Sequence, residues 1–455
     1  MSGRLAFAAV FFWGAALGTC ASAESTELKV IATPSIALYG EPFSWKVSGI
    51  QPGGKVTVRA SSRDARQIVW ESEAVFQADP TGVVDLNRQA PVSGSYAEAD
   101  IFGLLWSMRP TSSESKKPIV YRDNWVNGWT VDLAAADSEG RSSKTRFRCV
   151  LQKPGEALVR VPLEQEGLSG LLYYPAAGGP FPGVILLGGS EGGLSEARAR
   201  AFASNGFAAL TLAYFGFPNL PDELVEVPLE CVERAAAWMK TQPKVKAERL
   251  GLVGGSKGGE MALLAASRSR AFKAVVAMTP AAHAWEGHTM RFFSPDYQPV
   301  SSWSLGGRPL PYISFKVSPQ DKEKEMKGEL ESFVFFFRDS LVQADAAAIE
   351  KAAIPVEKIQ ASILLISGTD DRIWPSGEFC AAILARLKKA GFPHEVEHVS
   401  IDGGGHNSCL PFLITANRGL LIDGDPSGGS PRADARGGYR SWAATLAFLR
   451  RHLVR

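Results

Sequence analysis

The chain has 455 residues, of which 45% are hydrophobic and 21% charged, and its formal net charge at pH 7 is +2. This length and composition are typical of a soluble globular protein with two or three domains, and they exclude the disordered and fibrous classes. The near-neutral charge, with no long run of one sign, argues against nucleic acid or an anionic membrane surface as a partner.

The N-terminus, residues 1–23, is typical of an export signal. One arginine precedes an apolar run from Leu5 to Leu17, and the small-x-small pattern that a signal peptidase cleaves ends at Ala23. An anchor helix is disfavoured because the apolar run is shorter than the roughly 20 residues that span a bilayer. A lipoprotein signal at Cys20 is also disfavoured, because threonine is a poor residue before that cysteine. We therefore predict an exported protein whose mature form has no membrane span.

Residues 24–152 follow as a region of short strands. Runs such as KVTVRASS and WTVDLAAAD alternate polar and apolar residues, and turn clusters such as QPGGK, DPTG and DSEGR separate them. Short strands at this spacing, with no convincing helix among them, predict an antiparallel β-sandwich. The region offers no obvious catalytic group, so we expect a packing or interaction domain.

Residues 153–455 have a different pattern, in which apolar strands alternate with helices. The strand-like runs are LLYYP, GVILLGG, FAALTLAYF, RLGLVGG, KAVVAMTP, SILLISG and EVEHVSI. The helix-like runs are SEARARAFASNG, LECVERAAAWMKTQ, KGGEMALLAASR, EFCAAILARLKKAG and SWAATLAFLRRHL. This alternation predicts an α/β domain with a mostly parallel sheet covered on both faces.

Two segments interrupt the alternation. Residues 282–354 are rich in aromatic side chains and long enough to form a lid or pocket wall, although a plain buried core explains the aromatics equally well. Residues 410–440 form the second segment. Its part rich in Gly, Ser, Pro and Asp is expected to be a loop before the last helix.

Two stretches match the G-x-S-x-G pattern of a nucleophilic serine, GGSEGG at 188–193 and GGSKGG at 254–259. A nucleophile elbow requires a strand that ends at the serine and a helix that begins directly after it. Ser256 meets this requirement. After Ser190 the next helix-like start is Ser195, a plausible N-cap, so a loop intervenes. We therefore predict Ser256 as the nucleophile and the stretch around Ser190 as a turn.

That turn has an expected use in an oxyanion hole. In hydrolases of this architecture the oxyanion is held by the N–H after the nucleophile and by an N–H from the loop after the third strand. These groups would be the backbone N–H of Lys257 and those of Ser190 and Glu191. A glycine-rich turn without function is the alternative. The side chains of Lys257 and Arg372 are expected to be surface charges.

Carboxylates and a histidine follow at the ends of later strands. SILLISG is followed by Asp370 and Asp371, and EVEHVSI by a glycine-rich loop that carries His406. Serine, aspartate and histidine in this order are typical of α/β-hydrolases, with the histidine as base and the aspartate as its orienting group. The spacing from Gly368 and Pro375 favours Asp371 over Asp370, and a solvated turn or a helix cap is the alternative for both.

Metal and cofactor sites have no support in the sequence. No C-x-x-C or H-E-x-x-H motif occurs and the six histidines are scattered, so we predict neither a metal nor a cofactor. Four cysteines remain once the signal is removed. Because an exported protein meets an oxidising compartment, Cys380 and Cys409 could form a disulfide.

The sequence resembles the family of acyl-CoA thioesterases and bile acid-CoA:amino acid N-acyltransferases (BAAT). The resemblance rests on GSYAEADIFGLLWSMRP at 94–110, GLVGGSKGGEMAL, PVEKIQASILLISGTDDRIWPS and GGGHNS, and it spans nearly all of the mature chain. It implies an N-terminal β-sandwich, a C-terminal α/β-hydrolase domain and a triad of Ser256, Asp371 and His406. Serine as nucleophile is what the thioesterase members have, whereas the amino-acid-conjugating members use cysteine.

The resemblance implies hydrolysis of acyl-CoA thioesters to free acid and CoA through an acyl-enzyme. An export signal is unexpected for that role, because acyl-CoA is a cytosolic or organellar metabolite. One alternative is therefore an exported carboxylesterase, similar to dienelactone hydrolases, that acts on a non-CoA ester. A non-catalytic binding protein is the second alternative, since one scaffold serves many functions. In the thioesterase and carboxylesterase hypotheses the binding partner is a small-molecule substrate, an acyl thioester or an ester. The oligomeric state stays open.

Overall fold

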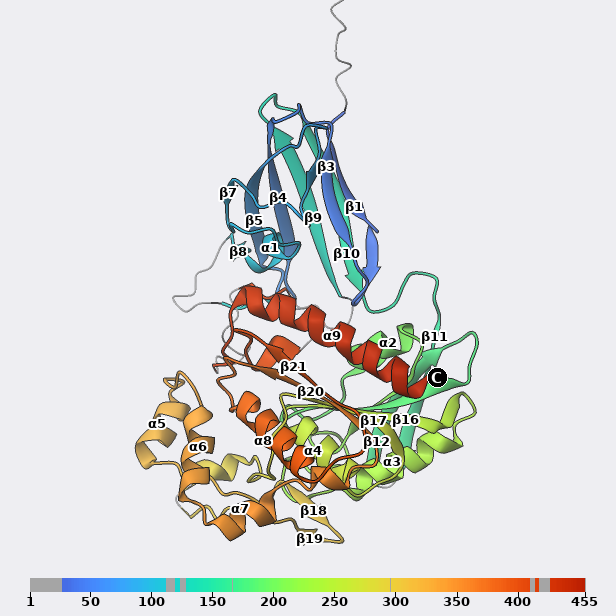
Figure 1. Cartoon of the computed structure of the whole chain (residues 1–455), viewed down its shortest axis with the longest axis vertical. Coiled ribbons are helices and arrows are strands. Elements are labelled where there is room, and N and C mark those ends of the chain that lie inside the picture. The colour runs from blue at the N-terminus through green and yellow to red at the C-terminus, as the bar shows by residue number, and fades with distance from the viewer. Residues whose placement is uncertain are drawn as a thin grey trace, which may run out of the picture.

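The computed structural model describes residues 27–111, 119–122, 128–165, 167–294, 296–409, 414–416 and 426–454. The predicted signal peptide, residues 1–23, lies outside these ranges. Figure 1 shows an all-β region formed by the first part of the described chain, packed against a larger region of mixed helices and strands.

Two sheets form the N-terminal region. The smaller sheet has the order β1-β3-β6, and the larger has the order β2-β10-β9-β4-β5-β7, with β8 pairing to β5. The smaller sheet contains β1 (Lys29–Thr33), β3 (Ser44–Ser48) and β6 (Val84–Asp85). The larger contains β2 (Ile36–Leu38), β4 (Lys55–Arg63), β5 (Val69–Gln77), β7 (Ser93–Gly94), β8 (Arg109–Pro110), β9 (Trp129–Asp137) and β10 (Ser142–Val150).

The alternation read from the sequence is what builds this sandwich. Along β4 the side chains are alternately exposed and buried, so Val56, Val58 and Ala60 all point into the core. The pairs are antiparallel except that of β2 with β10, which is parallel. Only residues 34–35 separate β1 from β2, because the chain passes from one sheet to the other without reversing. The region also has one short helix, α1 (Gly103–Trp106).

An eight-stranded sheet runs through the C-terminal region in the order β11-β12-β14-β13-β16-β17-β20-β21. Its strands are β11 (Leu158–Gln165), β12 (Leu168–Pro175), β13 (Phe181–Leu187), β14 (Ala208–Ala213), β16 (Val245–Gly255), β17 (Phe272–Met278), β20 (Ser362–Gly368) and β21 (Val396–Ile401). From β14 to β21 all neighbours are parallel, whereas β11 and β12 pair antiparallel at one edge. This order, with its antiparallel second strand, is that of the α/β-hydrolase fold.

All seven apolar runs expected as strands lie in this sheet, and β11 is an additional edge strand. Helices cover both faces, as Figure 1 shows. They are α2 (Glu196–Ser204), α3 (Glu230–Thr241), α4 (Lys257–Ala266), α8 (Ser376–Lys389) and α9 (Pro431–Leu453). The side chains of alternate residues of β13 point to opposite faces of the sheet. Val184 and Leu186 join a core with α2, α9 and the β-sandwich, and Ile185 and Leu187 join a core with α3, α4 and α8. The sandwich and one face of the sheet therefore share a continuous hydrophobic core.

The last helix begins earlier than the sequence suggested. Residues 431–440, expected to be part of a loop, form the first turns of α9. The start is fixed locally, because the Ser430 hydroxyl accepts a hydrogen bond from the N–H of Ala433 at 3.2 Å and Pro431 occupies the first helical turn. The two glycines within the helix, Gly437 and Gly438, are buried, which explains how a glycine-containing run is helical here.

Residues 282–354 form an excursion from the α/β alternation, at the bottom of the view in Figure 1. It contains η1 (Met290–Phe293), β18 (Trp303–Leu305), β19 (Arg308–Pro309), α5 (Pro319–Met326), α6 (Val334–Gln343) and α7 (Ala346–Ala352), and β18 pairs with β15 (Val227–Pro228). Trp285 and Trp303 are fully buried, and Phe336 and Phe337 nearly so. Much of its aromatic content is therefore core.

In the ranges that the structure describes, none of the helices has the length and apolar character needed to cross a membrane. The four cysteines in these ranges are buried, and no disulfide joins any two of them. The sequence left open whether Cys380 and Cys409 form a disulfide, and in the structure they do not. Each is buried separately, Cys380 on α8 and Cys409 beside the His406 carbonyl. Burial raises the pKa of each of these two thiols to about 12, so both stay protonated.

Candidate active site

Ser256 lies on the turn between β16 and α4. β16 ends one residue before it and α4 begins one residue after it. Its φ of 54° and ψ of −123° lie in a region that residues other than glycine rarely adopt. Its backbone N–H donates to the Met278 carbonyl of β17 at 2.9 Å, which holds the strained turn against the next strand. This strand-turn-helix geometry is that of a nucleophile elbow.

Two glycines of GGSKGG, Gly254 and Gly258, are required by close packing. A Cβ added to Gly254 would lie 2.0 Å from the Gly258 carbonyl oxygen, and one added to Gly258 would lie 2.0 Å from the Gly188 carbonyl oxygen. Such contacts are far shorter than any van der Waals separation. The first glycine of GGSEGG is less constrained, since the nearest atom to a Cβ on Gly188 would be a carboxylate oxygen of Glu191, at 3.1 Å. Of the two matching stretches, only the one around Ser256 is packed as an elbow.

The side chains of Ser256, His406 and Asp371 form one hydrogen-bonded chain. His406 Nε2 lies 3.0 Å from Ser256 Oγ, and His406 Nδ1 lies 3.0 and 2.9 Å from the two Asp371 oxygens. The Asp371 side chain is almost fully buried and also accepts from the N–H groups of Ile373 and Trp374. A carboxylate on Nδ1 keeps the imidazole proton on that nitrogen, so that Nε2 can accept a proton from a hydroxyl.

Asp370 takes no part in this chain. One of its oxygens accepts from Arg372 Nε at 3.1 Å, and the other accepts from the Gly429 N–H at 2.9 Å. The structure therefore places Asp371, and not its neighbour, beside His406. Arg372 has a side chain that is about half exposed, as expected of a surface charge.

The loop that carries His406 is also tightly packed. A Cβ on Gly405 would lie 2.2 Å from the Gly428 carbonyl oxygen, and the His406 N–H donates to the Ser427 carbonyl at 2.8 Å. The imidazole ring lies edge-to-face against Trp374, with the ring centroids 5.8 Å apart. The ring is thus oriented by backbone, carboxylate and aromatic contacts together.

The GGSEGG turn lies beside the elbow. A Cβ on Gly189 would lie 3.1 Å from Ser256 Cβ, so the backbone of this turn passes directly against the serine side chain. Ser190 and Glu191 have exposed side chains. Within the described ranges, no protein acceptor bonds to the backbone N–H groups of Ser190, Glu191 or Lys257. These N–H groups are available to a ligand at the position expected for an oxyanion hole.

The side chain of Lys257 is not a surface charge, contrary to the expectation from sequence. It is 1% exposed, and its Nζ lies 3.1 Å from Glu260 Oε2 and 2.8 Å from Ser302 Oγ. Glu260 in turn accepts from the Trp285 N–H at 3.0 Å and from Trp303 Nε1 at 2.6 Å. Burial lowers the pKa of Lys257 and raises that of Glu260, because both charged forms lose water. The pair joins α4 to the 282–354 excursion.

A signal for this buried pair was present in the sequence. In KGGEMALLAA, the lysine and the glutamate lie three positions apart and every other residue is apolar or glycine. On a helix these positions are neighbours, and a lone opposite-charge pair on an otherwise apolar helix indicates burial together.

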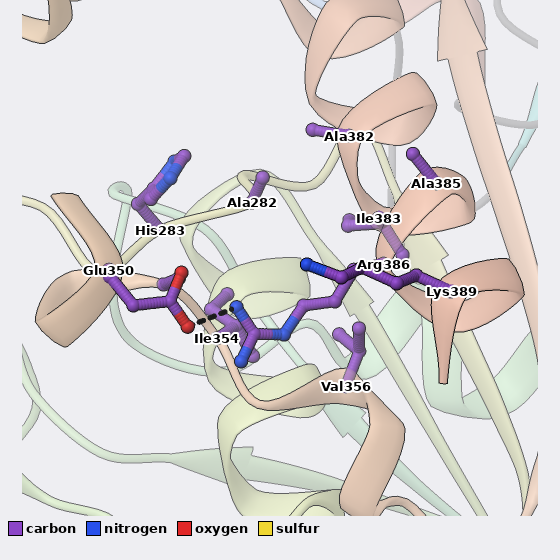
Figure 2. Close-up of a pocket in the computed structure, with 11 residues that line it drawn as sticks. Ala282, His283, Glu350, Ile354, Val356, Ala382, Ile383, Ala385, Arg386 and Lys389 are labelled. Carbon is purple, nitrogen blue, oxygen red and sulfur yellow. Dashed lines mark hydrogen bonds and ion pairs between the residues drawn. The ribbon is translucent and has the colours of Figure 1, made fainter. Parts of the chain in front are cut away.

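A separate cavity lies away from Ser256. It has a volume of about 280 Å³ and lies between α7 with its following loop and the C-terminal half of α8. Figure 2 shows Arg386 extending to Glu350, with 3.0 Å between Nη1 and Oε1. Ile354 and Ile383 are among the apolar residues that line the cavity. None of the predicted site residues lines this cavity. Among the described residues, no cluster of three or more His, Cys, Asp or Glu side chains could hold a metal ion.

The sheet order and the strand-turn-helix site together define an α/β-hydrolase. Residues 40–155 match the acyl-CoA thioester hydrolase/BAAT N-terminal region, and residues 227–455 match the BAAT/acyl-CoA thioester hydrolase C-terminal region. The chain belongs to this family, as the resemblance in its sequence predicted.

Individual relatives align along almost the whole chain. Acyl-coenzyme A amino acid N-acyltransferase 1 of Mus musculus is 30% identical over 437 residues, which cover 94% of this chain and 98% of the relative. Acyl-coenzyme A thioesterase 1 of Homo sapiens is 30% identical over 425 residues, covering 91% and 94%. Among solved structures, a dienelactone hydrolase-like promiscuous phosphotriesterase from metagenomic libraries is 16% identical, with a TM-score of 0.41 over 66% of this chain and 99% of its own.

Proposed function

We propose that this protein is a serine hydrolase that cleaves acyl thioesters of the acyl-CoA type. The observation that carries the proposal is the continuous chain from Ser256 Oγ through His406 to the buried Asp371 carboxylate, next to unpaired backbone N–H groups. Membership of the acyl-CoA thioester hydrolase/BAAT family supports the thioester as substrate.

The reaction proceeds in two steps. His406 Nε2 takes the Ser256 hydroxyl proton while Oγ attacks the acyl carbonyl, and the N–H groups of Lys257 and of Ser190 or Glu191 stabilise the oxyanion. The C–S bond then breaks, and His406 returns the proton to the leaving thiolate. In the second step His406 takes a proton from water, which attacks the acyl-serine. The acyl C–O bond to Ser256 Oγ then breaks, His406 returns the proton to Oγ, and the free acid leaves. Asp371 stabilises the imidazolium formed in each step.

Serine at position 256 supports water as the acceptor. In the resembled family, serine occurs in thioesterases and cysteine in the members that conjugate amino acids. Acylation of a serine gives an acyl-enzyme that is an oxygen ester. This ester is less reactive toward amines than the thioester that acylation of a cysteine would give. The resemblance therefore favours hydrolysis over transfer to an amino acid.

We also propose that the chain is exported and that cleavage follows Ala23. The support is the apolar run with its small-x-small ending in residues 1–23. Expression in a secreting host, followed by N-terminal sequencing, tests this: the mature chain is expected to begin at Glu24, and an intact N-terminus at Met1 contradicts export by this signal.

The substrate class is tested by comparing palmitoyl-CoA with a series of p-nitrophenyl esters on the purified mature protein. We expect turnover of palmitoyl-CoA at a kcat/KM above that for the esters. Turnover of the esters alone would support the alternative of an exported carboxylesterase.

A fluorophosphonate probe provides the test of catalysis itself. Labelling is expected in the wild type and in Ser190→Ala and is expected to disappear in Ser256→Ala, whereas an unlabelled wild type would indicate a non-catalytic binding protein.

A further inference from the structure

The segment Gly94–Pro110 carries part of the family resemblance, but it lies in the β-sandwich and contributes no side chain to the hydrogen-bonded chain at Ser256. Its most buried charged residue is Asp100, which is 4% exposed. One Asp100 oxygen accepts from the Phe102 N–H at 3.0 Å. The other accepts from Trp106 Nε1 at 3.2 Å and from Arg436 Nε at 3.0 Å. Asp100 thus accepts hydrogen bonds from both ends of the short helix α1. Its contact with Arg436 also connects the sandwich to α9.

Neighbouring contacts strengthen this connection. Arg432, one turn before Arg436 on α9, pairs with Glu98 and donates from Nη1 to Oε1 at 2.7 Å. Arg436 Nη2 donates to the Ala99 carbonyl at 3.3 Å. One turn further along α9, Tyr439 packs on Phe102, with 5.6 Å between ring centroids. Positions spaced by three or four lie on one face of a helix, so this face of α9 is bound to the sandwich.

The opposite face of α9 contacts the loop that carries His406. Asp434 is 2% exposed, and its Oδ1 accepts from the Gly405 N–H at 2.9 Å, one residue before His406. The Ser430 N–H donates to the Gly403 carbonyl at 3.2 Å. A Cβ on Gly437 would lie 2.9 Å from the Ser408 carbonyl oxygen, so the helix backbone rests directly on this loop.

We propose that the β-sandwich positions His406 through α9, with Asp100 and Asp434 as positioning residues on the two faces of that helix. The Asp100–Arg436 contact fixes the N-terminal half of α9, and Asp434 on its other face fixes Gly405 and hence the neighbouring imidazole. Because a displacement of about 1 Å at a catalytic group can cost on the order of a hundredfold in rate, a domain that never touches substrate can still control turnover. The proposal rests on the proposed function only in naming His406 as the base.

The proposal is tested on the full chain with Asp100→Asn, Asp434→Ala and Asp434→Asn. Asp132→Asn is the matched control, because Asp132 also pairs with an arginine of the sandwich, Arg146, but lies exposed and away from α9. The first readout is hydrogen–deuterium exchange of residues 402–409, which does not depend on activity. We expect exchange there to accelerate several-fold in Asp100→Asn and Asp434→Ala but not in Asp132→Asn.

The second readout is the rate of fluorophosphonate labelling together with kcat and KM. Asp434→Ala is expected to lower kcat and the labelling rate by about 10- to 100-fold with KM changed by less than about threefold. Asp434→Asn keeps an acceptor oxygen for the Gly405 N–H and is expected to restore most of the loss. Exchange of 402–409 in Asp100→Asn equal to that of the wild type would overturn the proposal, whatever the activity. A wild type that the probe does not label would instead contradict the proposed function.

Discussion

His406 Nε2 lies 3.0 Å from Ser256 Oγ, although 150 positions separate the two residues in the chain. The serine is held by a strained turn at the end of β16, and the histidine by a glycine-rich loop after β21. Parallel strands bring both ends to the same edge of the sheet, where folds of this class keep their reactive groups. The order of the parallel strands thus brings the two residues into contact. The groups around them lead to four predictions that can be measured.

The first consequence concerns the choice between two adjacent carboxylates. Asp371→Asn is expected to lower kcat by about 10³- to 10⁴-fold, because an amide on Nδ1 no longer stabilises the imidazolium and permits the wrong tautomer. Asp370→Asn is expected to change kcat less than about fivefold, since Asp370 contacts Arg372 and the Gly429 N–H instead. Steady-state kinetics of both variants on one substrate compare them. Equal losses in the two variants would contradict the assignment.

A second consequence concerns the glycines of the elbow. Gly258→Ala is expected to destabilise the fold or abolish soluble expression, because the new methyl would lie 2.0 Å from the Gly188 carbonyl oxygen. Gly255→Ala is the control, since a Cβ there meets nothing within 4 Å. Thermal unfolding of both variants measures the difference. A Gly258→Ala protein with a wild-type Tm would show that the elbow is packed differently.

The buried ion pair makes a third prediction. Lys257→Met leaves the Glu260 carboxylate buried without its cation, so the free energy of unfolding is expected to fall by about 3–5 kcal/mol. The double variant Lys257→Met/Glu260→Gln removes both charges and is expected to recover part of that loss. Urea denaturation of the wild type, both single variants and the double variant gives the coupling energy. Additive losses would mean that the two side chains do not stabilise each other.

The state of the cysteines makes a fourth prediction. Because the thiols of Cys149, Cys231, Cys380 and Cys409 are buried, a thiol reagent such as dithionitrobenzoate is expected to react slowly with the native protein. In denaturant without reductant, all four thiols of a chain that begins at Glu24 are expected to react. A count of two would reveal a disulfide.

The sequence predicted an antiparallel β-sandwich, an α/β-hydrolase fold and seven of the eight strands of the large sheet, because most of these strands are apolar runs between turn signals. It also favoured Ser256 over Ser190, since only Ser256 is followed directly by a helix. The edge strand β11, LVRVPLEQ, was not predicted, because it lies at the sheet edge and its sequence is not a continuous apolar run. The first turns of α9 were read as loop because their glycines, which the structure buries, are otherwise poor helix formers.

Side-chain environments were predicted less well, for a common reason. From the sequence, Lys257 was expected to be a surface charge and a disulfide between Cys380 and Cys409 stayed open, but the burial and distance that decide both come from segments far along the chain. Ser302 and Trp303 enclose the lysine and its glutamate, 45 and 43 positions from their partners. The apolar residues around Lys257 and Glu260 indicate that the two are buried together, but they do not show which distant residues enclose the pair.

The fold class, the strand-turn-helix at Ser256 and the order of serine, aspartate and histidine can be predicted from the sequence, because they depend on local patterns of apolar residues and glycine. The folded chain was needed to show that Asp371 and not Asp370 reaches His406, which residues enclose Lys257, and that α9 lies between the sandwich and the histidine loop. These contacts depend on which strand ends and helix faces lie close together in the folded chain, and the packing of the whole chain decides that.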